Sequence, residues 1–316
     1  MWLHGWRLRA LLLSIAASAA GYVAFSLWSG WHEVAAALAR IGIVGTLAAL
    51  SLSLVNYGLR FVRWQIYLAT FGHAIPHAAS LRIYLAGFAL TTTPGKMGET
   101  LRGVFLKPYG VSYPQSLAAF FSERLSDTIA GLLFTALGLW LYPPARPVVL
   151  LLGAAVALIL VLLQRPNWLR VAARRLPARL AGLTAAATEI VAHSGRCFRL
   201  PLLATGILLG IFAWGAEGVA FHYATQLLGS DISLQTALFI YAFSMLVGAL
   251  SFLPGGLGSA EFTMIALLLL NGMSQPMAVA VTVLIRLATL WFAVVLGIGA
   301  LLGLQPKTNA TVPHGE

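Results

Sequence analysis

The sequence predicts an all-α polytopic membrane protein made of two inverted repeats, each a broken or re-entrant helical hairpin followed by a transmembrane helix. Of its 316 residues, 59% are hydrophobic and 9% are charged, whereas a soluble domain has about 25% charged residues. The apolar runs are long and continuous, which favours helices over the short alternating strands of a membrane barrel. A sequence repeat around two breaks in these runs is the third observation. We treat residues 1–316 as a single membrane domain.

The first predicted span covers residues 8–28 and follows Arg7 and Arg9. A cleaved signal peptide is the alternative, because residues 17–19 read Ala-Ser-Ala, like a cleavage site. The apolar run continues to Trp28, which gives roughly the 20 residues that a span needs. We therefore expect an uncleaved first helix.

The second apolar run starts near Ile43 and ends in a cluster of cations and aromatic rings. Arg60 and Arg63 share a helix face with Asn56, and we expect them to reach the cytoplasmic interface. Later in the chain, uninterrupted runs cover residues 115–141, 148–164, 201–228 and 276–302, and interrupted regions cover 80–109 and 234–270.

The basic stretch 165–199 sets the predicted orientation. It holds seven arginines and one acidic residue, and such a stretch belongs in the cytoplasm. Because this charge lies beside predicted spans, we assign the net charge of +11 to orientation and expect no nucleic-acid partner. Both termini are cytoplasmic if each interrupted region enters and leaves on one side. A helix over residues 80–93 would be about 21 Å long, short of the ~30 Å hydrocarbon core, which favours a re-entrant hairpin.

An internal repeat aligns the two interrupted regions and the helices that follow them. A single shift places Glu99 on Glu261 and Arg124 on Arg286 without a gap. Charged residues are scarce in this chain, so these matches indicate a duplication. We place repeat 1 at about residues 80–141 and repeat 2 at about residues 234–303. The two copies would have opposite orientations, as in many transporters.

Proline and glycine mark each break in the apolar runs. Proline lacks an amide hydrogen and glycine permits turns that other residues resist, so we expect structural hinges here. The expected hinge residues are Pro94, Gly95, Pro254 and Gly255. A new helix would begin near Gly98 in the first break and near Gly258 in the second, and Gly256 is a further expected binding residue. Free amides at these starts would bind an anionic head group.

Ionisable residues accompany the breaks at predicted membrane depth, where each costs a few kcal/mol unless it is paired or functional. They are Lys96, Glu99, Arg102, Glu123, Arg124 and Asp127 in repeat 1, and Glu261 and Arg286 in repeat 2. One interpretation pairs Glu99 with Arg124 and Glu261 with Arg286 as braces. In the other, the cations also hold a phosphate, which suits the bidentate geometry of arginine. Glu123 and Asp127 share a helix face and would alternatively bind a cation or proton.

Known catalytic and cofactor motifs do not occur in the sequence. It has no P-loop, no His-Glu-x-x-His and no Gly-x-Ser-x-Gly, and its histidines lack ligand spacing. We therefore predict no metal, no cofactor and no catalytic residue. Glu217 lies within an apolar run and has no partner evident from the sequence.

Four segments carry a family resemblance. Residues 94–102 read Pro-Gly-Lys-Met-Gly-Glu-Thr-Leu-Arg, and residues 122–127 read Ser-Glu-Arg-Leu-Ser-Asp. Together with residues 253–261 and Arg286, and with an early helix at 59–64, they resemble the membrane region of the lysylphosphatidylglycerol synthases, or flippase-like domain family. The resemblance covers about residues 7–304 and implies movement of a lipid between leaflets. We expect the synthase domain to be missing, so the family name does not imply lysine transfer here.

We expect a protein of the inner (plasma) membrane that flips an anionic or polar lipid through a groove between the repeats, rather than an enzyme. The expected substrate-binding set comprises Lys96, Gly98, Glu99, Arg102, Arg124, Asp127, Gly256, Gly258, Glu261 and Arg286. Membrane lipids and lipid-biosynthetic enzymes are the expected partners. Two alternatives stay open. One is a membrane-embedded transferase with Glu123 and Asp127 as its acid–base pair, and the other is a non-transporting scaffold in lipid or glycolipid biosynthesis.

Overall fold

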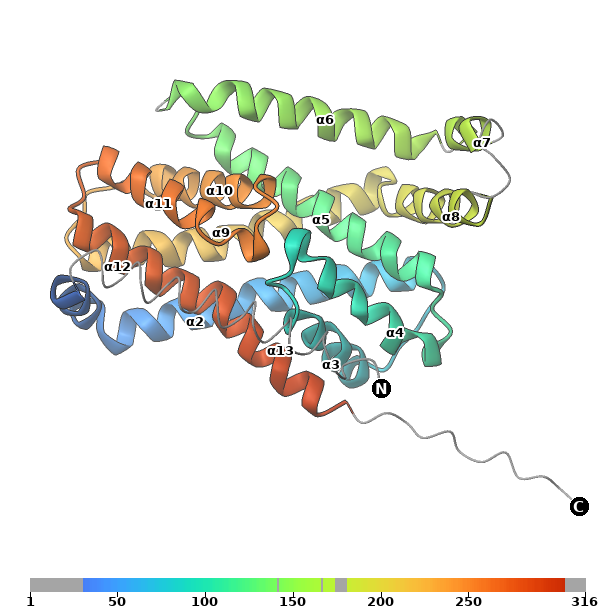
Figure 1. Ribbon diagram of the computed structural model, residues 1–316, viewed down its shortest axis with the longest axis horizontal. Coiled ribbons are helices and arrows are strands. Elements are labelled where there is room, and N and C mark those ends of the chain that lie inside the picture. Colours follow the sequence, from blue (N-terminus) through green and yellow to red (C-terminus); the bar gives the residue numbers. More distant parts are fainter. Residues whose placement is uncertain (1–30, 141, 166, 174–180, 305–316) are drawn as a thin grey trace, which may run out of the picture.

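The computed structural model describes residues 31–140, 142–165, 167–173 and 181–304. These residues form helices joined by turns, without a strand in the described ranges. The predicted first span at residues 8–28 lies outside them. Figure 1 shows α5 (Tyr113–Ala136) crossing the middle of the molecule, with α6 (Arg146–Gln164) along one edge and α3 (His77–Phe88) near the opposite one.

Helix α2 (Trp31–Thr70) is longer than the predicted second span. Gly42 interrupts its helical backbone with φ +65° and ψ −170°, so the predicted start near Ile43 coincides with a kink. Glycine adopts this conformation without the steric penalty of a side chain. Beyond the kink, α2 packs along α9 (Leu200–Leu227) and also contacts α12 (Gln275–Arg286).

Four helical stretches are long and apolar enough to cross a membrane, at residues 32–70, 143–164, 200–227 and 275–302. The last three confirm the apolar helices expected at 148–164, 201–228 and 276–302. The final stretch comprises α12, a π-helical turn (η6, Leu287–Trp291) and α13 (Phe292–Leu302). Helix α5 is not among the four, because it contains the charged residues Glu123, Arg124 and Asp127.

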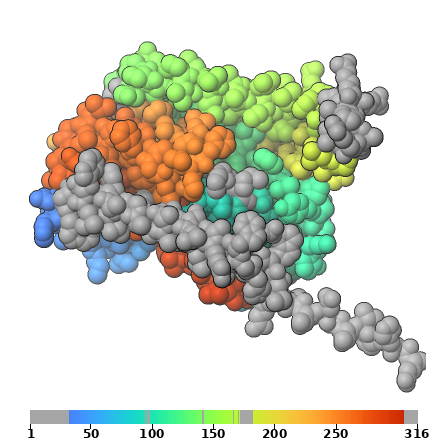
Figure 2. Space-filling view, viewed as in Figure 1, coloured from blue at the N-terminus to red at the C-terminus, as the bar shows by residue number. Residues whose placement is uncertain are grey.

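Helix α6 presents an apolar surface to the outside of the molecule. Leu150 and Leu151 are 69% and 75% exposed, and both figures show the helix along one edge (Figures 1 and 2). A contiguous apolar surface of this kind is stable against lipid tails, whereas water would leave its surface unfavourably hydrated.

Both interrupted regions are broken at their prolines, as expected. The first consists of α3, the 3₁₀ helix η1 (Pro94–Leu101), α4 (Arg102–Leu106) and η2 (Lys107–Tyr109). The second consists of α10 (Leu234–Leu250), the 3₁₀ turn η5 (Pro254–Gly256) and α11 (Ser259–Leu270). At ~1.5 Å per residue, α3 is about 18 Å long and α10 about 26 Å, so neither spans a ~30 Å core alone.

The two breaks lie against each other, because η1 contacts η5. A Cβ added to Gly255 would be 3.5 Å from the Cα of Thr92, which precedes the first break. The end of α3 is also packed closely against the backbone of α13. A Cβ on Gly297 of α13 would be only 2.1 Å from the amide nitrogen of Ala89, so only glycine fits there.

The basic stretch expected as a loop contains two helices, α7 (Asn167–Ala173) and α8 (Ala181–Cys197), of which α8 packs on α5 and α6. The link before α5 ends in a capping box: the Ser112 amide donates to Gln115 Oε1 at 2.9 Å and the Gln115 amide to Ser112 Oγ at 3.3 Å. Ser274, at the matching position before α12, makes no side-chain cap.

Candidate functional site

Asp127 on α5 is the centre of a buried ion-pair network. Arg60 and Arg63 of α2 reach its carboxylate at 3.3 and 2.5 Å, and Arg124 reaches it at 3.2 Å. The Trp214 indole also donates to it, at 3.3 Å. Arg60 and Arg63 are only 7% and 1% exposed. The prediction that they reach the cytoplasmic interface is therefore wrong, because Asp127 pairs with them inside the bundle.

Arg102 at the start of α4 belongs to the same network and lines none of the three cavities described below. Its guanidinium pairs with Glu99 of η1 and with Glu123 of α5, the latter at 2.9 Å. It also lies over the rings of Tyr84 and Trp64, at 4.8 and 5.7 Å from their centroids. Every face of this cation is thus occupied by protein, and the expectation that Arg102 meets a head group is not supported.

The two predicted Glu–Arg pairs differ in the structure. Arg286 Nε lies 2.5 Å from Glu261, and its Nη2 donates to the Gly255 carbonyl at 2.9 Å, which ties α12 to the second break. This pair is confirmed. Arg124 lies 3.8 Å from Glu99, whose closer ion-pair partner is Arg102. Arg124 therefore lies between the carboxylates of Glu99 and Asp127 and does not form an exclusive pair with Glu99.

The amides expected to face an anion are already used within the breaks. The Gly98 amide donates to the Thr93 hydroxyl at 2.7 Å, and the Gly258 amide to the Glu261 carboxylate at 2.6 Å. The Gly256 amide bonds to a carbonyl of its own turn at 2.9 Å. The prediction of free helix-start amides at Gly98 and Gly258 is therefore wrong, and the Gly256 amide is not free either.

A cavity of about 240 Å³ lies where the two breaks meet. Its cationic lining residues are Lys96 of η1, Arg124 of α5 and Arg286 of α12, and Asp127 is its one acidic lining residue. The remaining wall is largely apolar and includes Leu253 of the second break. The cavity thus combines positive charge from η1, α5 and α12 with an apolar wall.

A second cavity of about 50 Å³ adjoins the first. The two share part of their lining, including Lys96, Trp214 and Arg286. Glu217 of α9 and Tyr241 of α10 line only the smaller one, and the Tyr241 hydroxyl donates to the Glu217 carboxylate at 2.5 Å.

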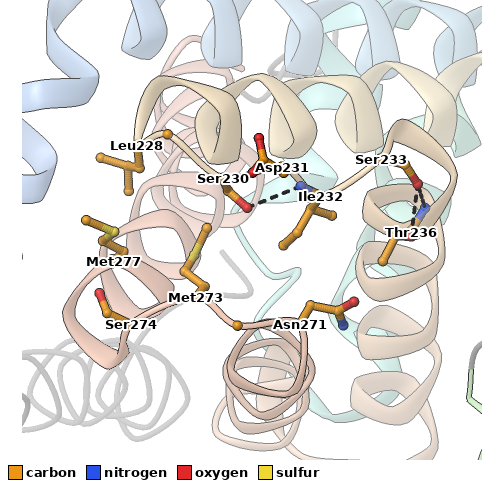
Figure 3. A pocket seen from close by; sticks show the side chains of 12 residues that line it. Leu228, Ser230, Asp231, Ile232, Ser233, Thr236, Asn271, Met273, Ser274 and Met277 are labelled. Carbon is orange, nitrogen blue, oxygen red and sulfur yellow. Dashed lines mark hydrogen bonds between the residues drawn. The ribbon is translucent and has the colours of Figure 1, made fainter.

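A larger cavity, about 580 Å³, lies away from the breaks, between the α9–α10 and α11–α12 links (Figure 3). Figure 3 shows Asp231, Asn271 and Met273 around it. Among the described residues, Asp231 is its only ionisable lining residue and no cation lines it, so it offers an anion no counter-charge there. Its size therefore does not make it the better candidate.

The described residues contain no group of three or more His, Cys, Asp and Glu side chains that would hold a metal ion. Glu123 pairs with Arg102, and Asp127 pairs with three arginines. Both carboxylates are thus neutralised by fixed cations. The alternative in which this pair binds a coupling cation is not supported by the geometry.

Sequence reasoning missed the contribution of α2 and of Trp214 on α9 to the site, whereas Glu217 of α9 was expected to face the cavity and lines the smaller one. The spacing of Asn56, Arg60 and Arg63 was the available signal, because it puts three polar groups on one face of an apolar helix. Trp214 carried no signal, since a lone tryptophan in an apolar run is ordinary.

Comparison with known proteins places this architecture in a family. The lysylphosphatidylglycerol synthase TM region matches residues 10–297 of the chain. A UPF0104 membrane protein of Pyrococcus horikoshii is 24% identical over 304 residues, covering 85% of this chain and 90% of that protein. Two UPF0104 membrane proteins of Methanothermobacter thermautotrophicus are 25% and 24% identical. They cover 86% and 69% of this chain, and 89% and 70% of their own lengths. The chain is a membrane protein that belongs to the lysylphosphatidylglycerol synthase TM region family.

Proposed function

We propose that this membrane protein moves a lipid with a negatively charged, phosphate-containing head group between leaflets, using the cavity where the breaks meet. Lys96 is the observation that carries the proposal. It lines both adjoining cavities and makes no ion pair with any carboxylate in the described ranges. A lysine charge at membrane depth is costly without a partner. An anionic head group would supply that partner.

Arg124 and Arg286, which line the same cavity, support the same assignment. Arg124 has 20% of its side chain exposed and is shared between two carboxylates, so its charge is not fully taken up by one protein partner. Arginine edges match phosphate oxygens in geometry and charge. The apolar part of the lining, including Leu253 and Leu290, suits the first carbons of lipid tails. A water-soluble anion would gain nothing from that surface.

The proposed route requires the two breaks to belong to inverted repeats, at about residues 80–141 and 234–303. The short lengths of α3 and α10 favour hairpins that turn back within the membrane. With residues 165–199 in the cytoplasm, both termini are cytoplasmic and the membrane is the inner (plasma) membrane. Rocking of one hairpin against the other would then expose the cavity to each leaflet in turn.

The enzymatic and scaffold alternatives explain less of the site. The transferase alternative assigns its acid–base chemistry to Glu123 and Asp127, which would have to exchange protons with the substrate. Glu123 and Asp127 are instead paired with arginines, so we propose that the chain is not an enzyme. A scaffold has no use for a cavity with a lysine that lacks a carboxylate partner. Docking of lipid-biosynthetic enzymes remains compatible with the transport role.

Reconstitution into liposomes tests the proposal. Purified protein is expected to accelerate leaflet exchange of tail-labelled phosphatidylglycerol, measured by dithionite quenching, and to leave labelled phosphatidylcholine much slower. Lys96→Gln should reduce phosphatidylglycerol exchange at least tenfold, because it removes the cation without a carboxylate partner. Lys107→Gln is the matched control, since Lys107 is exposed on η2 and lines neither cavity. Equal rates for Lys96→Gln and wild type would remove this cavity from the mechanism.

A further inference from the structure

One buried carboxyl group in the bundle stands outside the ion-pair network. Glu217 is 6% exposed and accepts a hydrogen bond from Tyr241. No salt bridge reaches it from the described residues. It lines the cavity of about 50 Å³, which has room for one or two water molecules. A buried carboxylate without a paired cation lowers the stability of the fold, so we infer that Glu217 has a functional role.

The charged and titratable groups around Glu217 come from five different helical elements. They are Tyr57 and Arg60 of α2, Lys96 of η1, Asp127 of α5, Tyr241 of α10 and Arg286 of α12. Two of the three cations at this cavity already have carboxylate partners, Arg60 with Asp127 and Arg286 with Glu261. Lys96 is the third, and it lines the larger cavity as well.

Glu217 and a bound head group therefore compete for one cation. With the larger cavity empty, the Lys96 ammonium is the available counter-charge for the Glu217 carboxylate. When an anionic head group takes up Lys96, the carboxylate loses the one cation at this cavity that makes no ion pair with another carboxylate in the described residues, in a medium of low dielectric constant. Protonation removes that penalty, because the neutral carboxylic acid no longer needs a cation.

We propose that Glu217 takes up one proton for each anionic head group bound, so that lipid movement is coupled to proton movement in the same direction. This inference rests on the proposed function. Uptake forms one O–H bond on the Glu217 carboxylate, the proton coming from water that reaches the smaller cavity. Release breaks that bond as the head group leaves and Lys96 returns. For a singly charged head group, the step carries no net charge across the membrane.

An amine-bearing head group is the rival occupant for Glu217. Arg60, Lys96 and Arg286 line the same small cavity and would repel an ammonium group. A proton removes the carboxylate charge without bringing a cation into this positive environment, so the geometry favours the proton.

Proteoliposomes under a pH gradient test the coupling. The outside is set one pH unit below the inside, and tail-labelled phosphatidylglycerol is followed by dithionite quenching. A one-to-one ratio of proton to lipid predicts accumulation in the inner leaflet by about tenfold at steady state, since one pH unit is a tenfold ratio of proton activity. A dye trapped in the lumen should report acidification in step with the lipid. Protein-free liposomes correct for spontaneous movement.

Glu217→Gln is the decisive variant. Glutamine has the shape of a protonated glutamate and still accepts the Tyr241 hydrogen bond, so folding should be preserved. This variant should equilibrate the lipid without responding to the gradient, whereas Glu189→Gln, at an exposed position on α8, should accumulate it as wild type does.

Three results would overturn the inference. Lipid exchange by wild type without lumen acidification or accumulation would show that no proton travels with it. Full accumulation of phosphatidylglycerol by Glu217→Gln would show that another group carries the proton. If Glu217→Gln lost only the transport of amine-bearing lipids, the result would favour the rival occupant. If wild type moves no phosphatidylglycerol at any pH, the proposed function fails first and the coupling fails with it.

Discussion

Replacement of Arg286 separates the structural role of this residue from its proposed role in transport. Arg286 is 3% exposed, pairs with Glu261 and donates to the Gly255 carbonyl. Arg286→Gln removes the charge, and its shorter side chain cannot reach the carbonyl. The Glu261 carboxylate then remains buried without the partner that it has in the wild type.

The expected cost follows from these contacts. Removing one member of a buried ion pair typically costs about 3–5 kcal/mol, most of which is the penalty of the remaining charge. Glu261→Gln in addition removes that charge, and its side-chain oxygen can still accept the Gly258 amide. We therefore expect the double variant to recover at least half of the lost free energy of unfolding. The remaining deficit is then at most about 1.5–2.5 kcal/mol, which agrees with the cost of losing the charged hydrogen bond to Gly255.

Stability and transport are measured on the same purified proteins. Denaturant titration in detergent gives the free energies of unfolding, and dithionite quenching gives phosphatidylglycerol exchange. The double variant is expected to be folded and still inactive, because the cavity has lost a cation from one wall. A double variant no more stable than Arg286→Gln would contradict the ion-pair reasoning. A stable double variant that exchanges lipid at the wild-type rate would remove Arg286 from the head-group site.

Three further changes test the rest of the site. Asp127→Asn leaves three arginines without their shared carboxylate, so it should lower the free energy of unfolding by at least 3–5 kcal/mol in denaturant titration, roughly the cost of breaking a buried pair. Gly256→Ala should cost about 1–3 kcal/mol in the same assay, because φ is +68° and the new Cβ would lie 3.0 Å from backbone. Cysteines replacing Thr92 and Gly255, in a chain whose Cys197 is replaced by alanine, should form a disulfide on oxidation. The lipid exchange lost on oxidation should return with reductant, whereas free thiols after oxidation would mean that the breaks are apart.

The sequence alone is enough to predict where the helices break and which charges mark the breaks. Proline removes an amide donor wherever it stands, so Pro94 and Pro254 interrupt helices without help from tertiary contacts. The pairing of Glu261 with Arg286 can also be predicted, because Glu99 and Arg124 stand at the same spacing earlier in the chain. The helix breaks have a local cause in the prolines, and the ion pair is indicated by a spacing that occurs twice in the sequence.

The partners of Arg60 and Arg63 could not be predicted in the same way. An arginine near the end of an apolar helix reaches the interface or pairs inside the bundle, and the helix face is the same in both cases. What decides is whether Asp127 of α5 lies opposite, which depends on the packing of α5 against α2. The amides of Gly98 and Gly258 were misjudged for a related reason. Their acceptors, Thr93 and Glu261, are set by the exact geometry of each turn.

The two breaks are held with unequal strength, and this bears on which of them can move. Residues of the first break, and of α2 and α5 around it, make six of the seven ion-pair contacts found in the described residues. The second break has one, between Glu261 and Arg286. Its Gly255, Gly256 and Gly258 have φ of +63°, +68° and +86°, conformations from which glycine changes at little cost. A rearrangement that opens the shared cavity therefore costs less at the second break. In the proposed transport cycle, α10 and α11 would move against a first hairpin that stays fixed to α2 and α5.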